Sequence, residues 1–126
     1  MPDDVAISVV VMGYRNRDTI LAALTSIVEQ MTPEPYEVLV VVSGDDGSAA
    51  AVKREHPDQR VVESPARLLP GGARNVGVAN TRGPIVAFLA ADCIAEPGWI
   101  AARLAAHRAG HALVASAMTH GGPDRP

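Results

Sequence analysis

Three short runs of almost unbroken apolar residues recur along the chain, and each has the length of a β-strand. They cover residues 6–12, 36–42 and 85–89, and valine and isoleucine are common in them. A strand that is covered on both faces shows this pattern, because neither of its sides meets water. The runs therefore predict buried strands of a parallel sheet.

Helical patterns separate these runs. From Asp18 to Gln30 apolar residues recur along one stripe, with Asn16 or Asp18 as a candidate cap and Thr32–Pro33 as the end. The pattern also predicts helices and shorter strands elsewhere: helices over 49–55, 71–80 and 97–109, strands over 60–63 and 112–118. Strands that alternate with helices in this way are joined by right-handed crossovers. We expect one three-layer α/β/α domain over residues 1–126, Rossmann-like, with a mainly parallel sheet and a disordered tail over 119–126.

Composition narrows the classes of function. A net charge of -3 and the lack of a basic run argue against nucleic-acid binding. The single cysteine fits a reducing compartment, and no apolar run approaches the roughly 18 residues of a membrane span. These features, with an N-terminus unlike a signal peptide, predict a cytoplasmic protein without a transmembrane segment. They leave peripheral membrane contact open.

Two common nucleotide motifs are absent. The turn over 13–18 holds one glycine, so it is not the dinucleotide fingerprint G-x-G-x-x-G. Gly72 and Gly77 have the spacing of a phosphate loop, but Val78 stands where that loop needs its lysine. Any phosphate site here must be built differently.

Two loops carry polar side chains that suit a ligand. The acidic loop 43–48 has carboxylates that accept hydrogen bonds from base or sugar groups, although taken alone it is better read as an ordinary Asp-Gly turn. Arg74 and Asn75 stand near a predicted helix N-terminus, where backbone N–H groups favour anions. A surface arginine beside a turn explains that segment equally well.

Asp92 is an isolated carboxylate just after the strand at 85–89. Ligands of α/β sheets bind at the carboxyl ends of parallel strands, and Mg²⁺ or Mn²⁺ often uses one or two carboxylates together with phosphate oxygens. The alternative is a helix cap ahead of Pro97, but Asp92 lies five residues too early for one. Trp99 is better read as an anchor for the last helix than as a ligand platform, and Cys93 as a small packed side chain.

Taken in order, the chain resembles the nucleotide-sugar half of an inverting GT-A glycosyltransferase of family 2, from Ile7 to about Met118. The matching segments are 8–14, 18–20, 36–41, 45–48, 72–77, 86–93 and 96–99. The resemblance implies a site for a nucleotide-diphosphate sugar. The residues that it assigns to the nucleotide sugar are Gly13, Tyr14, Ser43, Asp45, Asp46, Arg74 and Asn75. It assigns Asp92 to Mg²⁺ or Mn²⁺ under the diphosphate, where a cation stabilises the charge of the leaving group.

The chain departs from the family pattern in three places. Ala90 stands at the first position of the family's Asp-x-Asp motif, so the ribose contact is missing and Asp92 remains. The acidic loop aligns to the family's Asp-Asp-Gly-Ser only with a two-residue extension. Members of the family continue into an acceptor-binding half that holds the catalytic base, which an inverting transfer requires and which no residue here supplies.

Two hypotheses follow for this chain. In the first it binds a nucleotide-diphosphate sugar with a divalent metal, and the acceptor half lies elsewhere. In the second it is a non-catalytic interaction or binding module, truncated or degenerate, that retains the fold. The second predicts a homo-oligomer or a second chain covering the sheet edge and apolar surface that the acceptor half would otherwise cover.

Overall fold

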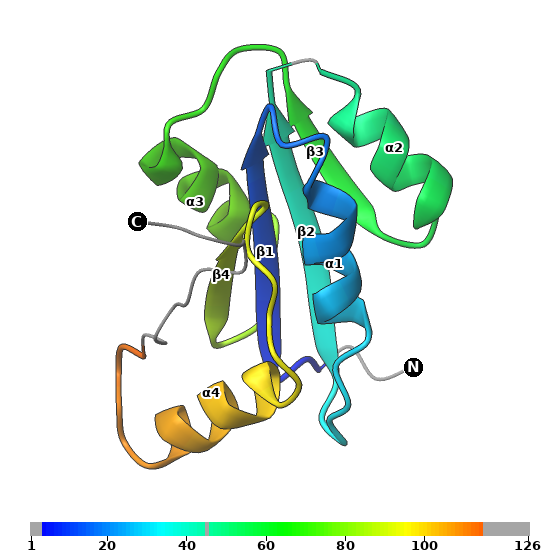
Figure 1. Cartoon of the computed structure of the whole chain (residues 1–126). Helices are drawn as coiled ribbons and strands as arrows, with labels where there is room; N and C mark the ends of the chain where they lie inside the picture. The colour runs from blue at the N-terminus through cyan, green and yellow to red at the C-terminus, as the bar shows by residue number, and fades with distance from the viewer. Residues whose placement is uncertain (1–3, 45, 115–126) are drawn as a thin grey trace, which may run out of the picture.

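The described part of the chain forms a four-stranded parallel sheet with helices on both faces (Figure 1). The computed structural model describes residues 4–44 and 46–114. Its elements are β1 (Ile7–Tyr14), α1 (Ile20–Val28), β2 (Tyr36–Ser43), α2 (Ser48–Glu55), β3 (Arg60–Ser64), α3 (Pro70–Ala79), β4 (Val86–Ala90) and α4 (Trp99–Arg108). The expected α/β class with three layers and a parallel sheet is confirmed.

The strand order is β3-β2-β1-β4. The chain steps outward from β1 to β2 and β3, then crosses back through α3 to place β4 on the other side of β1. The order therefore reverses between β1 and β4, and such a switch point is where open α/β sheets bind ligands. The register sets Met12 opposite Ala90 and Tyr14 opposite Ser43, so the carboxyl ends of β4, β1 and β2 lie along one edge.

The two faces of the sheet bury separate cores because successive strand residues point to opposite sides. On one face, Val9 and Val11 of β1 pack in a core with α1, α2 and α4. On the other face, Val10 packs with Leu39 and with Ala73 of α3. The apolar runs of β1 and β2 are buried on both sides, which explains why they are continuous rather than alternating.

Some predicted details are wrong. Neither Asn16 nor Asp18 caps α1: its N-cap is Thr19, which makes no side-chain cap hydrogen bond. The Asn16 side chain instead accepts a hydrogen bond from the Tyr14 N–H at 2.9 Å. The helix expected to open at Pro97 begins at Trp99.

The predicted last strand over 112–118 is not found where it can be checked. Residues 112–114 have no strand structure, and the remainder of that segment lies outside the described residues. The predicted tail over 119–126 also lies outside them. The sheet of the described part of the chain therefore has β4 at one edge and β3 at the other.

Candidate functional site

Asp92 lies at the switch point between β1 and β4. The Ala91 N–H donates to the Met12 carbonyl at 2.8 Å, which continues the β1–β4 pairing one residue beyond β4. The fit beside it is close, since a Cβ on Gly13 would come within 3.0 Å of the Ala91 Cβ. Asp92 follows directly with an exposed side chain. The predicted carboxylate thus stands at the edge where ligands bind.

The loop that carries Asp92 is tied to the end of α1. The Ser26 hydroxyl accepts a hydrogen bond from the Ala95 N–H at 2.9 Å. The Gln30 side chain accepts from the Ile100 N–H at 3.1 Å and donates to the Glu96 carbonyl at 2.8 Å. These bonds satisfy backbone groups before and within the first turn of α4. They also limit how far the loop can move.

A metal at Asp92 would have to be shared with a ligand. Among the described residues there is no group of three or more His, Cys, Asp or Glu side chains that could enclose a metal ion. One hard carboxylate suits Mg²⁺ or Mn²⁺ when phosphate oxygens and water complete the shell. Burial, together with the neighbouring Asp92 carboxylate, raises the pKa of the Cys93 thiol. A protonated thiol is a poor metal ligand, so Cys93 adds little to the site.

Tyr14 is the last residue of β1 at this edge, and two arginine guanidinium groups lie near its ring. The Arg67 guanidinium carbon lies 4.4 Å from the ring centroid, and that of Arg15 lies 5.5 Å away. Gly44 packs against the ring, because a Cβ there would come within 3.0 Å of two ring carbons. Sequence reasoning missed Arg67, since nothing in the local pattern links it to Tyr14.

Ser43 and Asp46 form hydrogen bonds that join the loops at this edge. Ser43 is buried, and its hydroxyl accepts from the Leu68 N–H at 3.0 Å. Asp46 accepts from the Ser48 hydroxyl at 2.6 Å and from the Arg17 N–H at 3.1 Å. Burial opposes ionisation of Asp46, but these hydrogen bonds outweigh it and lower its pKa. Both side chains are engaged in joining loops, while Asp45 lies outside the described residues.

Arg74 and Asn75 are exposed on α3. The Arg74 guanidinium carbon lies 5.8 Å from the ring centroid of Phe88 on β4, the strand that leads to Asp92. Of the other predicted residues, Gly13 and Tyr14 at the end of β1 and Asp92 beyond β4 lie at the edge, whereas Ser43 and Asp46 form hydrogen bonds that join its loops.

Cations without a carboxylate partner gather around this edge. Within the described residues, Arg15, Arg67 and Arg74 contact aromatic rings and form no ion pair. Three arginines elsewhere form ion pairs: Arg54 with Glu55, Arg60 with Glu37 and Arg108 with Glu34. These three cations are therefore available to an anionic ligand, at an edge that also carries the carboxylates of Asp46 and Asp92.

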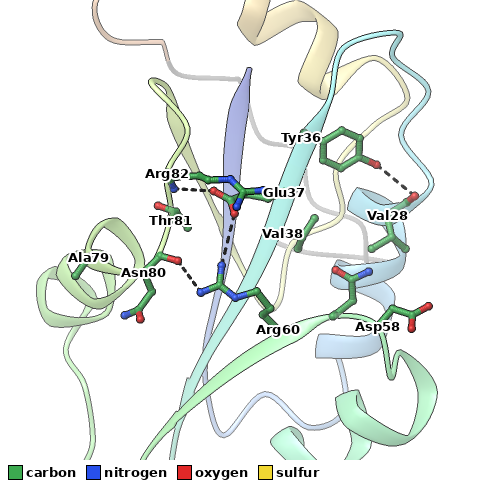
Figure 2. Close-up of a pocket in the computed structure, with 11 residues that line it drawn as sticks. Val28, Tyr36, Glu37, Val38, Asp58, Arg60, Ala79, Asn80, Thr81 and Arg82 are labelled. Carbon is green, nitrogen blue, oxygen red and sulfur yellow. Dashed lines mark hydrogen bonds and ion pairs between the residues drawn. The ribbon is translucent and has the colours of Figure 1, made fainter. Parts of the chain in front are cut away.

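A cleft of about 810 Å³ lies at the opposite edge, by the amino ends of β2 and β3 (Figure 2). Its polar centre is Glu37, which accepts from the Ser8 hydroxyl at 2.6 Å and the Arg82 N–H at 2.7 Å. Arg60 pairs with the same carboxylate at 3.5 Å. None of the predicted site residues lines this cleft, and we do not place the nucleotide there.

The sequence also matches the model of a protein family. Residues 8–125 match the model of glycosyl transferase family 2. The chain belongs to glycosyltransferase family 2. A curated relative, validoxylamine A glucosyltransferase of Streptomyces hygroscopicus subsp. limoneus, is 33% identical over 107 residues, which are 80% of this chain and 23% of that protein.

Solved structures support the GT-A fold of this family 2 domain. The mannosyltransferase PcManGT of Pyrobaculum calidifontis, in complex with GDP-Man and Mn²⁺, matches with a TM-score of 0.69 and 29% identity over 86% of this chain and 33% of that one. S. aureus TarS 1-349 in complex with UDP matches with a TM-score of 0.70 and 25% identity. The match covers 83% of this chain and 32% of that one. The family 2 domain spans 33%, 23% and 26% of the length of three curated relatives.

Residues 4–44 and 46–114 include no helix with both the length and the apolar character needed to span a bilayer.

Proposed function

We propose that this family 2 domain binds a nucleotide-diphosphate sugar along the carboxyl edge of its sheet. One observation carries the proposal: Asp92 stands exposed at the β1–β4 switch point, with Arg74 beside β4. The GDP-Man and UDP complexes of similar structures support it. A cytoplasmic location, with or without membrane contact, stays a prediction.

In this proposal Asp92 holds Mg²⁺ or Mn²⁺ together with the diphosphate. The metal supplies positive charge that stabilises the leaving nucleoside diphosphate. Arg74 adds a further positive charge close to β4, and Gly13 lets the chain approach closely beside Asp92. The transfer itself would be inverting. We assign no described residue as the catalytic base.

The test is calorimetric titration of the 126-residue chain with UDP and GDP, in Mn²⁺ and in EDTA. We expect at least one nucleotide to bind at least tenfold more weakly in EDTA, since a metal held by Asp92 would supply positive charge to the diphosphate. Asp92→Asn should weaken binding in Mn²⁺ to a similar degree. Asp58→Asn, an exposed aspartate at the opposite cleft, is the matched control and should bind like wild type. Equal affinity of Asp92→Asn and wild type in Mn²⁺ would contradict the proposal.

A second candidate function is a non-catalytic interaction module. The observation in its favour is that β4 pairs only with β1 in the described residues, so its outer edge is open to another strand. Ile94, just beyond that strand, is 61% exposed. This candidate predicts a homo-oligomer, or a complex with a second chain, by light scattering. A monomer that binds nucleotide with Mn²⁺ argues against it.

A further inference from the structure

The cleft at the amino edge of the sheet lies where β3 begins later than β2. β2 starts at Tyr36, but its pairing with β3 starts only at Leu39, opposite Arg60. Residues 36–38 therefore have a strand neighbour on the β1 side and none on the other side. The cleft of about 810 Å³ is lined by these residues, by the turn before β3 and by the end of α3 with the loop that follows it (Figure 2). Its volume is that of a small-molecule site.

The charges in the lining of the cleft balance one another. The acidic side chains are Glu37 and Asp58, and the basic ones are Arg60 and Arg82. Neutral polar groups such as the Gln59 amide make up much of the rest. A balanced lining does not select an anion or a cation, and an apolar ligand would leave its polar groups without partners. The lining therefore suits a neutral ligand that both donates and accepts hydrogen bonds.

Glu37 and Arg60 hold a hydrogen-bond acceptor beside a donor. The Ser8 hydroxyl and the Arg82 N–H donate to Glu37 Oε2 at 2.6 and 2.7 Å, which fixes the carboxylate. Its other oxygen, Oε1, lies 3.5 Å from Arg60 Nη1, longer than the roughly 3 Å of a good hydrogen bond. Arg60 is held through Nη2, which donates to the Asn80 carbonyl at 2.8 Å. A ligand hydroxyl can therefore donate to Oε1 and accept from Nη1 at the same time.

The groups around this pair suit the rest of a sugar ring. The Gln59 side chain is half-buried and forms no hydrogen bond with any described residue, so its amide is available as donor and acceptor. Arg82 adds the N–H donors of an exposed side chain. The ring of Tyr36 also lines the cleft, and its hydroxyl donates to the Ile27 carbonyl at 3.0 Å, which fixes the ring. An aromatic ring offers an apolar surface to the C–H groups of a sugar.

We propose that this cleft is a second binding site, for a neutral saccharide, in which one sugar hydroxyl is shared by Glu37 and Arg60. The inference goes beyond the proposed nucleotide site and uses none of its residues. Along the strands, at least about 13 Å separate the level of Glu37 from the end of β4, which leads to Asp92. A sugar unit held at Glu37 is therefore out of reach of a diphosphate at Asp92.

The test is NMR titration of the isotope-labelled 126-residue chain in EDTA, which separates it from any metal-dependent nucleotide binding. The probes are the methyl glycosides of glucose, mannose and galactose, together with maltotriose. We expect at least one probe to shift the backbone amides of Gln59, Arg60 and Arg82 in a saturable way, with a dissociation constant in the millimolar range. The amide of Asp92 should not shift.

Two variants connect the binding to the proposed contacts. Glu37→Gln should weaken binding of that probe about tenfold, because it replaces a charged acceptor with a neutral amide. Gln59→Ala should weaken it about threefold, and it removes no hydrogen bond of the described structure. Glu63→Gln, an exposed glutamate of β3 outside the cleft, is the control and should bind like wild type. The amide spectrum of each variant shows whether it is folded, and Gln59→Ala decides the test if Glu37→Gln does not fold.

Three results would overturn the proposal. In the first, none of the four probes shifts the cleft amides in a saturable way. In the second, folded Glu37→Gln and Gln59→Ala bind the probe like wild type, so that neither side chain holds a sugar hydroxyl. In the third, inorganic phosphate shifts the same amides at lower concentration than any sugar, which would identify an anion site in place of a saccharide site.

Discussion

Gly77 of α3 lies so close to Val10 of β1 that a Cβ on the glycine would come within 2.7 Å of the Val10 Cγ1. A glycine inside a helix can serve close packing or the approach of a ligand. The contact with Val10, which is fully buried, identifies close packing as the reason. The glycine lets α3 rest directly on the central strand.

Gly77→Ala should therefore destabilise the protein although alanine favours helices. The helix propensity gains about 1 kcal/mol, but overpacking against a buried valine costs about 1–3 kcal/mol. We expect a net loss in the free energy of unfolding, measured in urea. Gly72→Ala is the matched control in the same helix, because its Cβ would meet only the Leu68 side chain at 3.8 Å. A Gly77 variant as stable as this control would show that α3 can shift away from β1.

Removing the ties between α1 and the Asp92 loop should weaken metal-dependent nucleotide binding. Ser26→Ala leaves the Ala95 N–H without its partner, and Gln30→Ala frees the Ile100 N–H and the Glu96 carbonyl. Each change should cost about 1 kcal/mol of stability. Because the loop then has more freedom, we also expect severalfold weaker UDP binding in Mn²⁺, measured well below the unfolding temperature.

Gln59→Ala, at the opposite cleft, serves as the control for the loop variants. It should leave the affinity for UDP in Mn²⁺ unchanged. If Ser26→Ala and Gln30→Ala lose stability but bind UDP like wild type, the ties stabilise the fold without positioning Asp92.

The Glu37 carboxylate should make stability depend on acid pH. Burial opposes its ionisation, but hydrogen bonds from Ser8 and Arg82 and the charge of Arg60 outweigh that effect and lower its pKa. Figure 2 shows the contacts of Glu37 with Arg82 and Arg60. Above the ordinary pKa of 4.5 both folded and unfolded chains carry the charge, and its contribution is complete. Below 4.5 the unfolded chain binds the proton first, so the contribution is lost as pH falls through the folded-state pKa.

Glu37→Gln tests this dependence. At neutral pH the variant should be about 1–2 kcal/mol less stable than wild type, since its amide keeps some hydrogen bonds but not the charge. The difference should shrink as the pH of urea unfolding is lowered below 4.5. The exposed Glu63→Gln is the control. A difference that stays constant across this range would rule out a lowered Glu37 pKa as its source.

Much of the fold could be predicted because its signals are local. The apolar runs at 36–42 and 85–89 became β2 and β4, within one residue at each bound, because burial on both faces requires apolar side chains throughout. The turn chemistry at the helix ends was less reliable. Asn16 looked like a cap, but its side chain bonds to the Tyr14 backbone instead. The Asn16 side-chain oxygen can accept from backbone N–H groups on either side of it, and the sequence alone does not show which of them it binds.

The same contrast between local and long-range signals applies to the candidate site. The sequence by itself determined that a lone carboxylate, Asp92, follows a buried strand, because a strand that ends at the ligand-binding edge is recognised from its own residues. Only the tertiary structure decided that Arg67 lies on Tyr14 and that Gly77 rests on Val10. Those pairs come from segments far apart in the chain, and they meet because the crossover through α3 brings β3 and β4 to opposite sides of β1. Contacts of that kind depend on the order of strands in the sheet, which the pattern along the chain does not encode.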